Sequence, residues 1–227
     1  MSLTSPRISH LRLSSWKSIT SHLSRKRPQP VGFRNMKAAY ADPPYLGCGK
    51  KLYGKYHSEA AIWDTPEAHA RLAAQLEAEY DAWALSCSTP SLQTLLPLMP
   101  QGVRVAAWVK PFAVFKPGVG VAYAWEPVIF REGRKRSRKQ PTARDWVSAN
   151  ITLKTGLTGA KPVQFCEWLF DLLTLEPDDD FTDIFPGTGI VGLTWNSWRE
   201  HKRASRAADF DRNSVICEPT SGTEASK

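Results

Sequence analysis

The sequence contains little cysteine and no long run of apolar residues. Its 227 residues include four cysteines, which stand far apart and form neither a Cys-x-x-Cys pair nor a Cys/His cluster. That spacing argues against a zinc site and against a disulfide scaffold, and it is typical of a reducing cytoplasm. No apolar run approaches the length of a membrane-spanning helix. We therefore predict a soluble cytoplasmic protein that needs neither a metal nor a membrane.

Acidic residues are absent from the first 35 positions. The whole chain has 30 basic and 22 acidic residues, and removing the seven basic residues of 1–35 leaves 23 against 22. Any field that attracts nucleic acid must then come from local clusters within the remainder. Residues 1–35 are predicted to form a disordered basic extension. The alternatives are an organellar targeting peptide, a phosphate-contacting arm, or sequence ahead of a start at Met36.

Strand-like and helical patterns alternate from Met36 onward. Apolar stretches typical of strands occupy 36–41, 82–87, 103–109 and 181–184, and another begins at Trp125. Helix starts follow between them, two of them marked by a threonine N-cap ahead of proline. This alternation predicts an α/β fold with a doubly wound, mostly parallel sheet that is covered by helices on both faces. We expect one domain over 36–217 and a disordered tail over 218–227.

Two motifs carry the most information about function. Asp42-Pro43-Pro44-Tyr45 follows the first predicted strand, and Asp183-Ile184-Phe185-Pro186-Gly187-Thr188-Gly189 joins the last predicted strand to a helix. Each alone is weak, because one is also ordinary turn chemistry and the other an ordinary strand-to-helix turn. In open α/β sheets, ligands bind outside the carboxyl ends of the strands. Glycines also let the backbone approach a ligand closely, and a helix start offers free N–H groups. Together the motifs predict a ligand site at one sheet edge.

A cluster of cations between 131 and 144 is the clearest electrostatic feature of the folded part. It holds seven basic residues against the single acid Glu132, within an insert at about 131–150. One interpretation is a loop that lies along nucleic-acid phosphates, and the alternative is a solvated surface loop. The predicted nucleic-acid contacts are Arg134, Lys135, Arg136, Arg138 and Lys139.

These motifs resemble those of the S-adenosylmethionine-dependent DNA amino-methyltransferases, which methylate an exocyclic amine of adenine or cytosine. Asp42-Pro43-Pro44-Tyr45 looks like their catalytic tetrapeptide, 183–189 like their cofactor loop, and Lys161-Pro162 like the element ahead of that loop. Trp108-x-Lys110 and Trp125-Glu126-Pro127 also match related positions. The catalytic motif precedes the cofactor loop, as in the circularly permuted β-type branch, and the likeness is closest to small phage and prophage enzymes. The resemblance covers roughly 37–198.

The resemblance implies a Rossmann-like methyltransferase domain with S-adenosylmethionine as cofactor and DNA as partner. It implies that Asp42, Pro43, Pro44 and Tyr45 are catalytic, holding the amine and stacking on the base. It implies cofactor contacts from Lys161, Pro162, Asp183, Phe185, Pro186, Gly187, Thr188 and Gly189. The alternatives are a surface role for Lys161 at a helix start, and a purely structural role for Asp183 in ordering the glycine loop.

We predict transfer to N6 of adenine in DNA, because aspartate rather than serine stands at position 42. The alternatives are cytosine N4, adenine in RNA, or an inactive relative that only binds nucleic acid. Related enzymes usually carry a strand after the cofactor-loop helix, with an acid for the cofactor ribose. Near 203–211 no such strand is expected, and Asp209 and Asp211 are the candidate substitutes. No dedicated target-recognition domain is expected either, so the basic insert would have to serve.

Overall fold

The structure is a computed structural model of the chain. It describes residues 35–55, 57–112, 117–138, 140–151 and 160–215, with side chains as far as residue 209. The predicted tail, nearly all of the predicted extension, and Lys139 lie outside the described residues.

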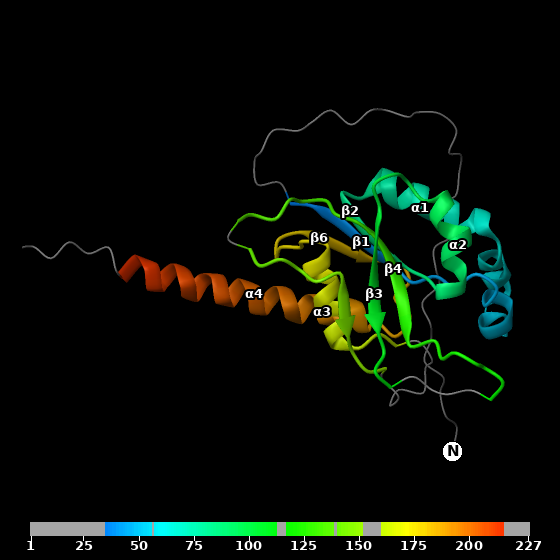
Figure 1. The fold of residues 1–227 in the computed structure, drawn as a ribbon. Helices are drawn as coiled ribbons and strands as arrows, with labels where there is room; N and C mark the ends of the chain where they lie inside the picture. The colour runs from blue at the N-terminus through cyan, green and yellow to red at the C-terminus, as the bar shows by residue number, and fades with distance from the viewer. Residues whose placement is uncertain (1–34, 56, 113–116, 139, 152–159, 216–227) are drawn as a thin grey trace, which may run out of the picture. The chain divides into compact units, whose positions relative to one another are not determined.

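A six-stranded sheet organises the described part of the chain (Figure 1), in the order β5-β3-β4-β2-β1-β6. The strands are β1 (Lys37–Ala41), β2 (Ala82–Ser86), β3 (Arg104–Val109), β4 (Trp125–Arg131), β5 (Trp146–Ser148) and β6 (Asp180–Asp183). Strand β1 pairs in parallel with β2 and β6, and β3 pairs in parallel with β5. Of these six strands, β4 alone runs against its neighbours, β2 and β3. The predicted α/β fold with a mostly parallel sheet is confirmed.

The connection between β3 and β4 contains no helix among its described residues. This explains why β4 runs antiparallel to its neighbours. A parallel neighbour requires a crossover, usually helical, whereas an antiparallel neighbour needs only a returning loop. The described residues of this connection, 110–112 and 117–124, form no helix, and the Lys110 N–H donates to the Ala124 carbonyl at 2.7 Å. The amino end of β4 therefore meets the carboxyl ends of β2 and β3.

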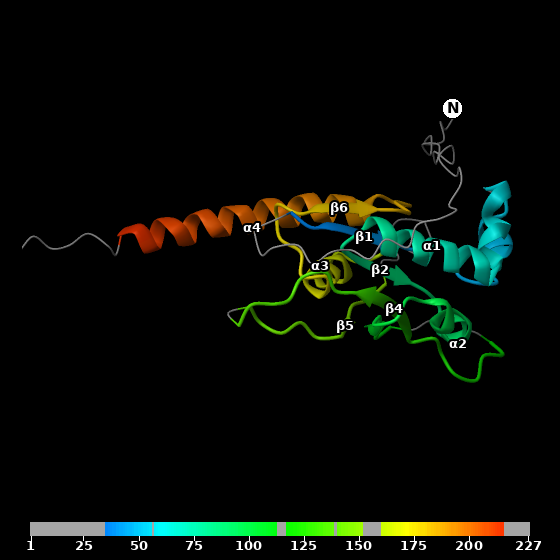
Figure 2. The same cartoon turned by 90° about the horizontal axis from the view of Figure 1, so that it is seen from above.

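Helices cover both faces of the sheet, as predicted for a doubly wound fold (Figure 2). One face packs against α1 (Pro66–Glu79) and α2 (Leu92–Leu95), in a core that includes Leu76, Trp83, Leu85 and Ile129. The other face packs against α3 (Val163–Leu172) and α4 (Ile190–Val215). Short helical segments at Gly49–Tyr53, Ser58–Asp64, Thr89–Ser91 and Leu96–Leu98 complete the described helices.

The tryptophan-rich composition is explained in part by an aromatic cluster on the α3/α4 face. Phe170 lies 5.2 Å from Trp195 and 5.5 Å from Trp198, measured between ring centroids, and Phe181 lies 5.3 Å from Trp195. These contacts fix the first turns of α4 against α3 and β6. Beyond Glu200 the described side chains of α4 are all exposed. The predicted absence of a strand there is explained, because α4 continues to Val215.

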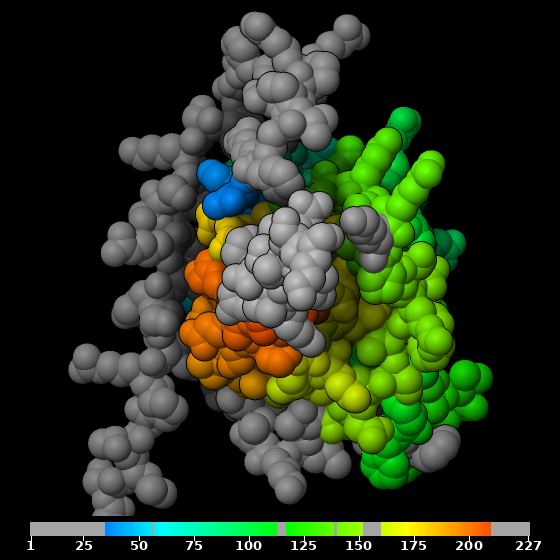
Figure 3. All heavy atoms as spheres, turned by 90° about the vertical axis from the view of Figure 1, so that its left-hand side faces the viewer, coloured from blue at the N-terminus to red at the C-terminus, as the bar shows by residue number. Residues whose placement is uncertain are grey.

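The first part of the basic insert, with Arg134 to Arg138, lies at the end of the sheet opposite the motifs, whereas its last part contains β5, which pairs with β3. Because β4 is reversed, its last residue Arg131 pairs with Trp83, near the amino end of β2. In Figure 1 the insert forms the loop at the left, whereas Gly49–Asp64 and residues 117–124 lie at the right. Seven residues of β4 separate the two ends by roughly 20 Å. Figure 3, which faces the left-hand end, shows insert side chains projecting from the surface beside α4.

Candidate active site

The two motifs lie side by side because β1 and β6 are parallel neighbours. Tyr40 pairs with Asp183, and the Ile184 N–H donates to the Tyr40 carbonyl at 2.9 Å. Asp42 follows two residues after Tyr40. The carboxyl ends of β1 and β6 thus bring Asp42 and Asp183 to the same edge, as the sequence predicted.

Lys161 is the ionic partner of Asp42. It lies just before Pro162, the residue that caps α3, and its side chain is only 5% exposed. Its Nζ is 3.0 Å from Asp42 Oδ2 and 5.3 Å from the centre of the Trp108 ring. This burial excludes the alternative in which Lys161 is an ordinary surface lysine. It joins the Asp42-Pro43-Pro44-Tyr45 motif to the start of α3 across 119 residues of sequence.

Glu126 adds a second carboxylate to this edge. Tyr45 donates its hydroxyl to Glu126 Oε2 at 2.8 Å, and Lys110 Nζ lies 2.5 Å from Oε1. Lys161 Nζ lies 3.4 Å from Oε2, so it stands between the two carboxylates. Two lysines and two carboxylates from four separate segments therefore form a neutral network. In the sequence, Lys110 and Glu126 are only family-like positions, with no sign that they touch Tyr45 or Lys161.

The network shifts the pKa values of its members in opposite directions. Burial raises the pKa of the Asp42 carboxyl, and the charge of Lys161 opposes the shift without reversing it. Burial also acts to raise the pKa of Glu126, but Lys161 and Lys110 together outweigh it and the pKa is lowered. Glu126 is therefore the firmly ionised carboxylate, and Asp42 is the one more ready to hold a proton.

The glycine turn between β6 and α4 is held open by unusual backbone angles. Gly187 has a φ of +46° and Gly189 a φ of +75°, conformations that side chains disfavour. The Gly189 N–H donates to the Pro186 carbonyl at 2.6 Å, and the Leu193 N–H donates to the Gly189 carbonyl. Pro186, Gly187 and Thr188 are exposed. The turn thus presents accessible backbone beside Asp183.

Asp183 carries an unpartnered buried oxygen. Its Oδ1 accepts the Phe185 N–H at 3.3 Å, while Oδ2 is buried with no hydrogen-bond partner among the described residues. Burial raises the pKa of this carboxyl to about 6, with Asp42 adding to the shift. A buried acceptor without a partner is costly, so a ligand that donates to Oδ2 would be favoured there.

The segment after Tyr45 folds back onto the same edge. Asp64 accepts the N–H groups of Gly49 at 2.6 Å and Lys50 at 2.9 Å. Trp63 packs edge-on against Phe185 of the glycine turn at 5.1 Å between centroids. His69, buried on α1, holds Trp63 in turn, with Nε2 2.9 Å from the Trp63 carbonyl. No sequence signal pointed to this support of the glycine turn by Trp63.

The predicted nucleic-acid contacts in the insert divide into two groups. Arg134 makes a bidentate ion pair with Asp179, at 2.9 and 2.8 Å, and Asp179 is 2% exposed. Arg136 donates to the Asp171 and Pro141 carbonyls. These two guanidinium groups anchor the loop. Lys135 and Arg138 are exposed, and their role as phosphate contacts stays a prediction.

Neither candidate substitute for a ribose-binding acid fits the glycine turn. Residue 209 lies 19 positions beyond Ile190 on α4, which places it roughly 30 Å along the helix from the turn. Asp211 lies further along the same helix. The sequence offers Asp209 and Asp211 as possible substitutes only, and both lie far from the turn because the chain continues as helix to Val215 and does not return to the sheet edge.

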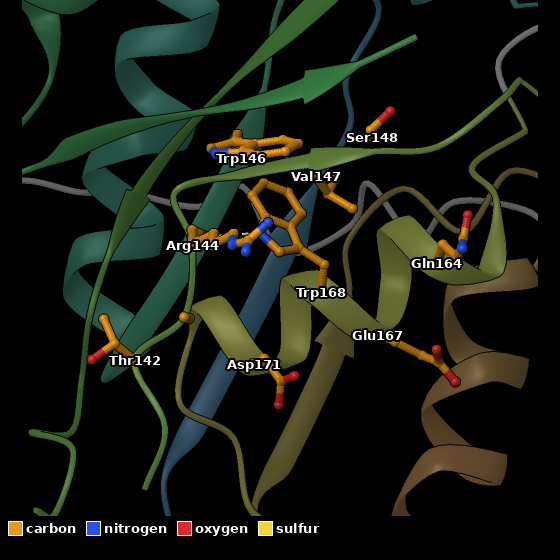
Figure 4. A pocket seen from close by; sticks show the side chains of 10 residues that line it. Thr142, Arg144, Trp146, Val147, Ser148, Gln164, Glu167, Trp168 and Asp171 are labelled. Carbon is orange, nitrogen blue, oxygen red and sulfur yellow. Dashed lines mark hydrogen bonds between the residues drawn. The ribbon is translucent and has the colours of Figure 1, made fainter. Parts of the chain in front are cut away.

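A separate hollow of about 590 Å³ lies between β5 and α3 (Figure 4). Its lining includes Arg144, Trp146, Gln164, Trp168 and Asp171, of which only Arg144 belongs to the cluster of cations singled out in the sequence. Among the residues that the structure describes, no group of three or more His, Cys, Asp or Glu side chains could hold a metal. Nor is any described helix long and apolar enough to cross a membrane.

The described residues thus define a doubly wound α/β protein with charged side chains and an exposed glycine turn at its carboxyl edge. No protein-family model and no curated protein matches the chain. Among solved structures, it is similar to M1.HpyAVI in complex with SAM, with 15% identity and a TM-score of 0.47 over 70% of this chain and 76% of that one. A second crystal structure, of M1.HpyAVI, gives 14% identity and a TM-score of 0.46 over 73% and 77%. Both likenesses are distant.

Proposed function

We propose that the protein transfers a methyl group from S-adenosylmethionine to the exocyclic N6 of adenine in DNA. The observation that carries the proposal is the meeting of two motifs at one sheet edge. Asp42 stands there in a charged network, and Asp183 stands beside it with an unpartnered buried oxygen. A hydrogen-bond acceptor for an amine and an open glycine turn are what an amino-methyltransferase requires.

The residues of the glycine turn fit the methionine part of the cofactor. Asp183 Oδ2 is a buried anionic acceptor for an ammonium group, and the turn from Phe185 to Gly189 offers accessible backbone beside it. Lys161 borders the same edge through its contact with Asp42, and Pro162 follows it in the chain as the cap of α3. When bound, S-adenosylmethionine supplies an electrophilic methyl group on a sulfonium. No metal takes part in this proposal.

Asp42 and Pro43 would hold the reacting amine. The lone pair of an exocyclic amine is delocalised into the ring, which makes the amine a poor nucleophile. Asp42 and the Pro43 carbonyl would each accept one N–H and favour the pyramidal form. Consecutive prolines fix φ and keep these acceptors in place. The proton released after methyl transfer would pass to Asp42, whose pKa burial has raised.

Lys161 and Glu126 would position the catalytic tetrapeptide. Lys161 holds Asp42 from one side, and Glu126 fixes the Tyr45 hydroxyl from the other. A ring anchored at its hydroxyl offers one face for stacking on a base that has left the helix, which an in-stack amine requires in order to be reached. The network would therefore align the amine acceptors and the stacking surface as a unit.

Nucleoside mass spectrometry tests the proposal. The purified protein is incubated with labelled S-adenosylmethionine and with DNA or RNA, and the nucleosides are then analysed. We expect labelled N6-methyladenosine in its deoxy form. Labelled N4-methylcytosine, or label in RNA alone, would replace the proposed base or nucleic acid. Cofactor and nucleic-acid binding without any transfer would reduce the protein to a binding relative.

A further inference from the structure

Exposed aromatic and basic side chains flank the proposed active site on two sides. Phe112 is 61% exposed, Tyr123 is 59% exposed and Trp125 is 38% exposed. Phe112 and Tyr123 belong to the returning chain between β3 and β4, and Trp125 is the first residue of β4, next to Glu126 in the chain. Exposed apolar surface of this kind on a soluble protein often marks an interaction site.

The basic side of this surface follows directly from the catalytic tetrapeptide. Lys50, Lys51 and Lys55 are exposed on the segment after Tyr45. Asp64 fixes the backbone of this segment through the N–H groups of Gly49 and Lys50, which leaves the lysine side chains to solvent. We name the open-edge surface as Lys50, Lys51, Lys55, Phe112, Tyr123 and Trp125.

The two sides are close enough for one ligand to touch both. The aromatic side begins at β4 and the basic side at the end of β1, and only β2 lies between these strands. Two strand spacings amount to about 10 Å. In both Figure 1 and Figure 2 the two segments project at the right-hand end of the sheet. Asp42 lies at this same edge, at the end of β1.

We propose that the open-edge surface binds an unpaired nucleic-acid strand, with the lysines on phosphates and the aromatic rings on bases. Charge complementarity selects this occupant, because three exposed lysines stand on one side of the aromatic rings. A groove that combines cations with stacking aromatics is the usual design for single strands, and every base offers a face to stack on. The inference rests on the proposed function, since it names the form of substrate that reaches Asp42.

In this proposal the main substrate contact is the open-edge surface and not the insert. The insert lies at the opposite end of the sheet, and Arg134 and Arg136 are held there by protein partners. A strand that delivers a base to Asp42 meets Lys50 and Tyr123 before it can reach Lys135 or Arg138. Specificity would then come from the bases stacked at the open edge rather than from the insert.

Fluorescence anisotropy with labelled strands of about 12 nucleotides, as DNA and as RNA, tests the surface. The variants are Tyr123→Ala and Phe112→Ala for stacking, and the double variant Lys50→Gln/Lys51→Gln for phosphate contact. We expect each aromatic variant to weaken strand binding about tenfold. The lysine variant should reduce the slope of log K against log salt by about 1.4, which corresponds to two phosphates.

Matched controls separate local contact from general effects. Lys37→Gln/Arg71→Gln removes the same charge from exposed positions on β1 and α1, and Trp146→Ala removes an aromatic ring that is 44% exposed elsewhere. Both should leave strand binding within about twofold of the wild type. Equal effects from Lys50→Gln/Lys51→Gln and its control Lys37→Gln/Arg71→Gln would contradict the proposal. An absence of any effect from Tyr123→Ala and Phe112→Ala would contradict it as well. So would dimer dissociation on loss of the aromatics, measured by sedimentation, because it would assign the surface to a protein interface.

The readouts also separate this surface from the proposed reaction. Strand binding is measured without S-adenosylmethionine, so the surface can stand even when no methyl transfer is found. A wild type that methylates DNA, with variants that bind strands and methylate as well as it does, would leave the reaction in place and remove the surface. The ratio of the DNA and RNA affinities identifies the preferred strand.

Discussion

The two ends of the sheet carry comparable numbers of charges but use them differently. At the amino end of β1 and β2, Arg134 forms ion pairs with Asp179 and Glu176, and Arg131 forms one with Glu77. At the carboxyl end, Lys161 lies between Asp42 and Glu126, and Asp183 keeps a buried oxygen without a partner among the described residues. A cluster of charges in the sequence therefore does not indicate which side chains face a ligand and which form ion pairs within the protein.

Removal of the Asp42 carboxylate is expected to have the largest effect. Asp42→Ala removes the proposed acceptor for the amine and for its proton, so methyl transfer should fall by about 10²–10⁴. Binding of S-adenosylmethionine, measured by calorimetry, should change little, because Asp183 and the glycine turn remain. Asp42→Asn keeps the shape of the side chain and guards against misfolding. Unchanged turnover in both variants would remove Asp42 from the mechanism.

Substitutions at the amino end of the sheet, where Arg134 is paired, should change the stability of the protein rather than its activity. Arg134→Ala leaves Asp179, 2% exposed, without its cation, although the Met36 and Glu176 N–H groups still bond to it. Loss of one partner of a buried pair typically costs about 3 kcal/mol. Urea denaturation should show this decrease in the free energy of unfolding. Arg138→Ala is the matched control, since its exposed side chain should matter by less than about 0.5 kcal/mol. Equal stability of the two variants would contradict the anchoring role of Arg134.

Asp183 should make ligand affinity at the carboxyl edge of the sheet depend on pH. Its pKa is raised to about 6, so the carboxyl is charged above that pH and neutral below it. Affinity for S-adenosylmethionine should weaken as pH falls through about 6, and Asp183→Asn should bind about tenfold more weakly at neutral pH, without this dependence. The stability of the free protein should change with pH in the opposite direction. A raised folded-state pKa stabilises the fold at low pH, and that contribution is lost as pH rises through about 6. Calorimetric titration and urea denaturation over the same pH range check both signs, and a pH-independent wild-type affinity would remove Asp183 from the cofactor site.

The sequence predicted the local features of the fold better than its charged contacts. Strand–helix alternation and the glycines of 183–189 were sufficient to predict an α/β sheet with both motifs at one edge, because each depends on nearby residues. The Lys161–Asp42 pair and the Lys110–Glu126 pair depend on which strands become neighbours, and no local pattern contains that information. The position of the insert could not be predicted for the same reason. It follows from the reversal of β4, which becomes visible only in the pairing of β4 with β2 and β3.

The smallest expected effect concerns the two exposed cations of the insert. Lys135 and Arg138 lie roughly 20 Å from the carboxyl edge, so they can contact only nucleic acid that extends well beyond the target base. Lys135→Gln/Arg138→Gln should weaken binding to a duplex of about 24 base pairs by about twofold, with a smaller loss of salt dependence than Lys50→Gln/Lys51→Gln produces. Binding isotherms at several salt concentrations compare the two pairs directly, since each variant removes two positive charges. A larger effect from the insert pair would reverse the ranking of the two ends and make the insert the principal phosphate contact.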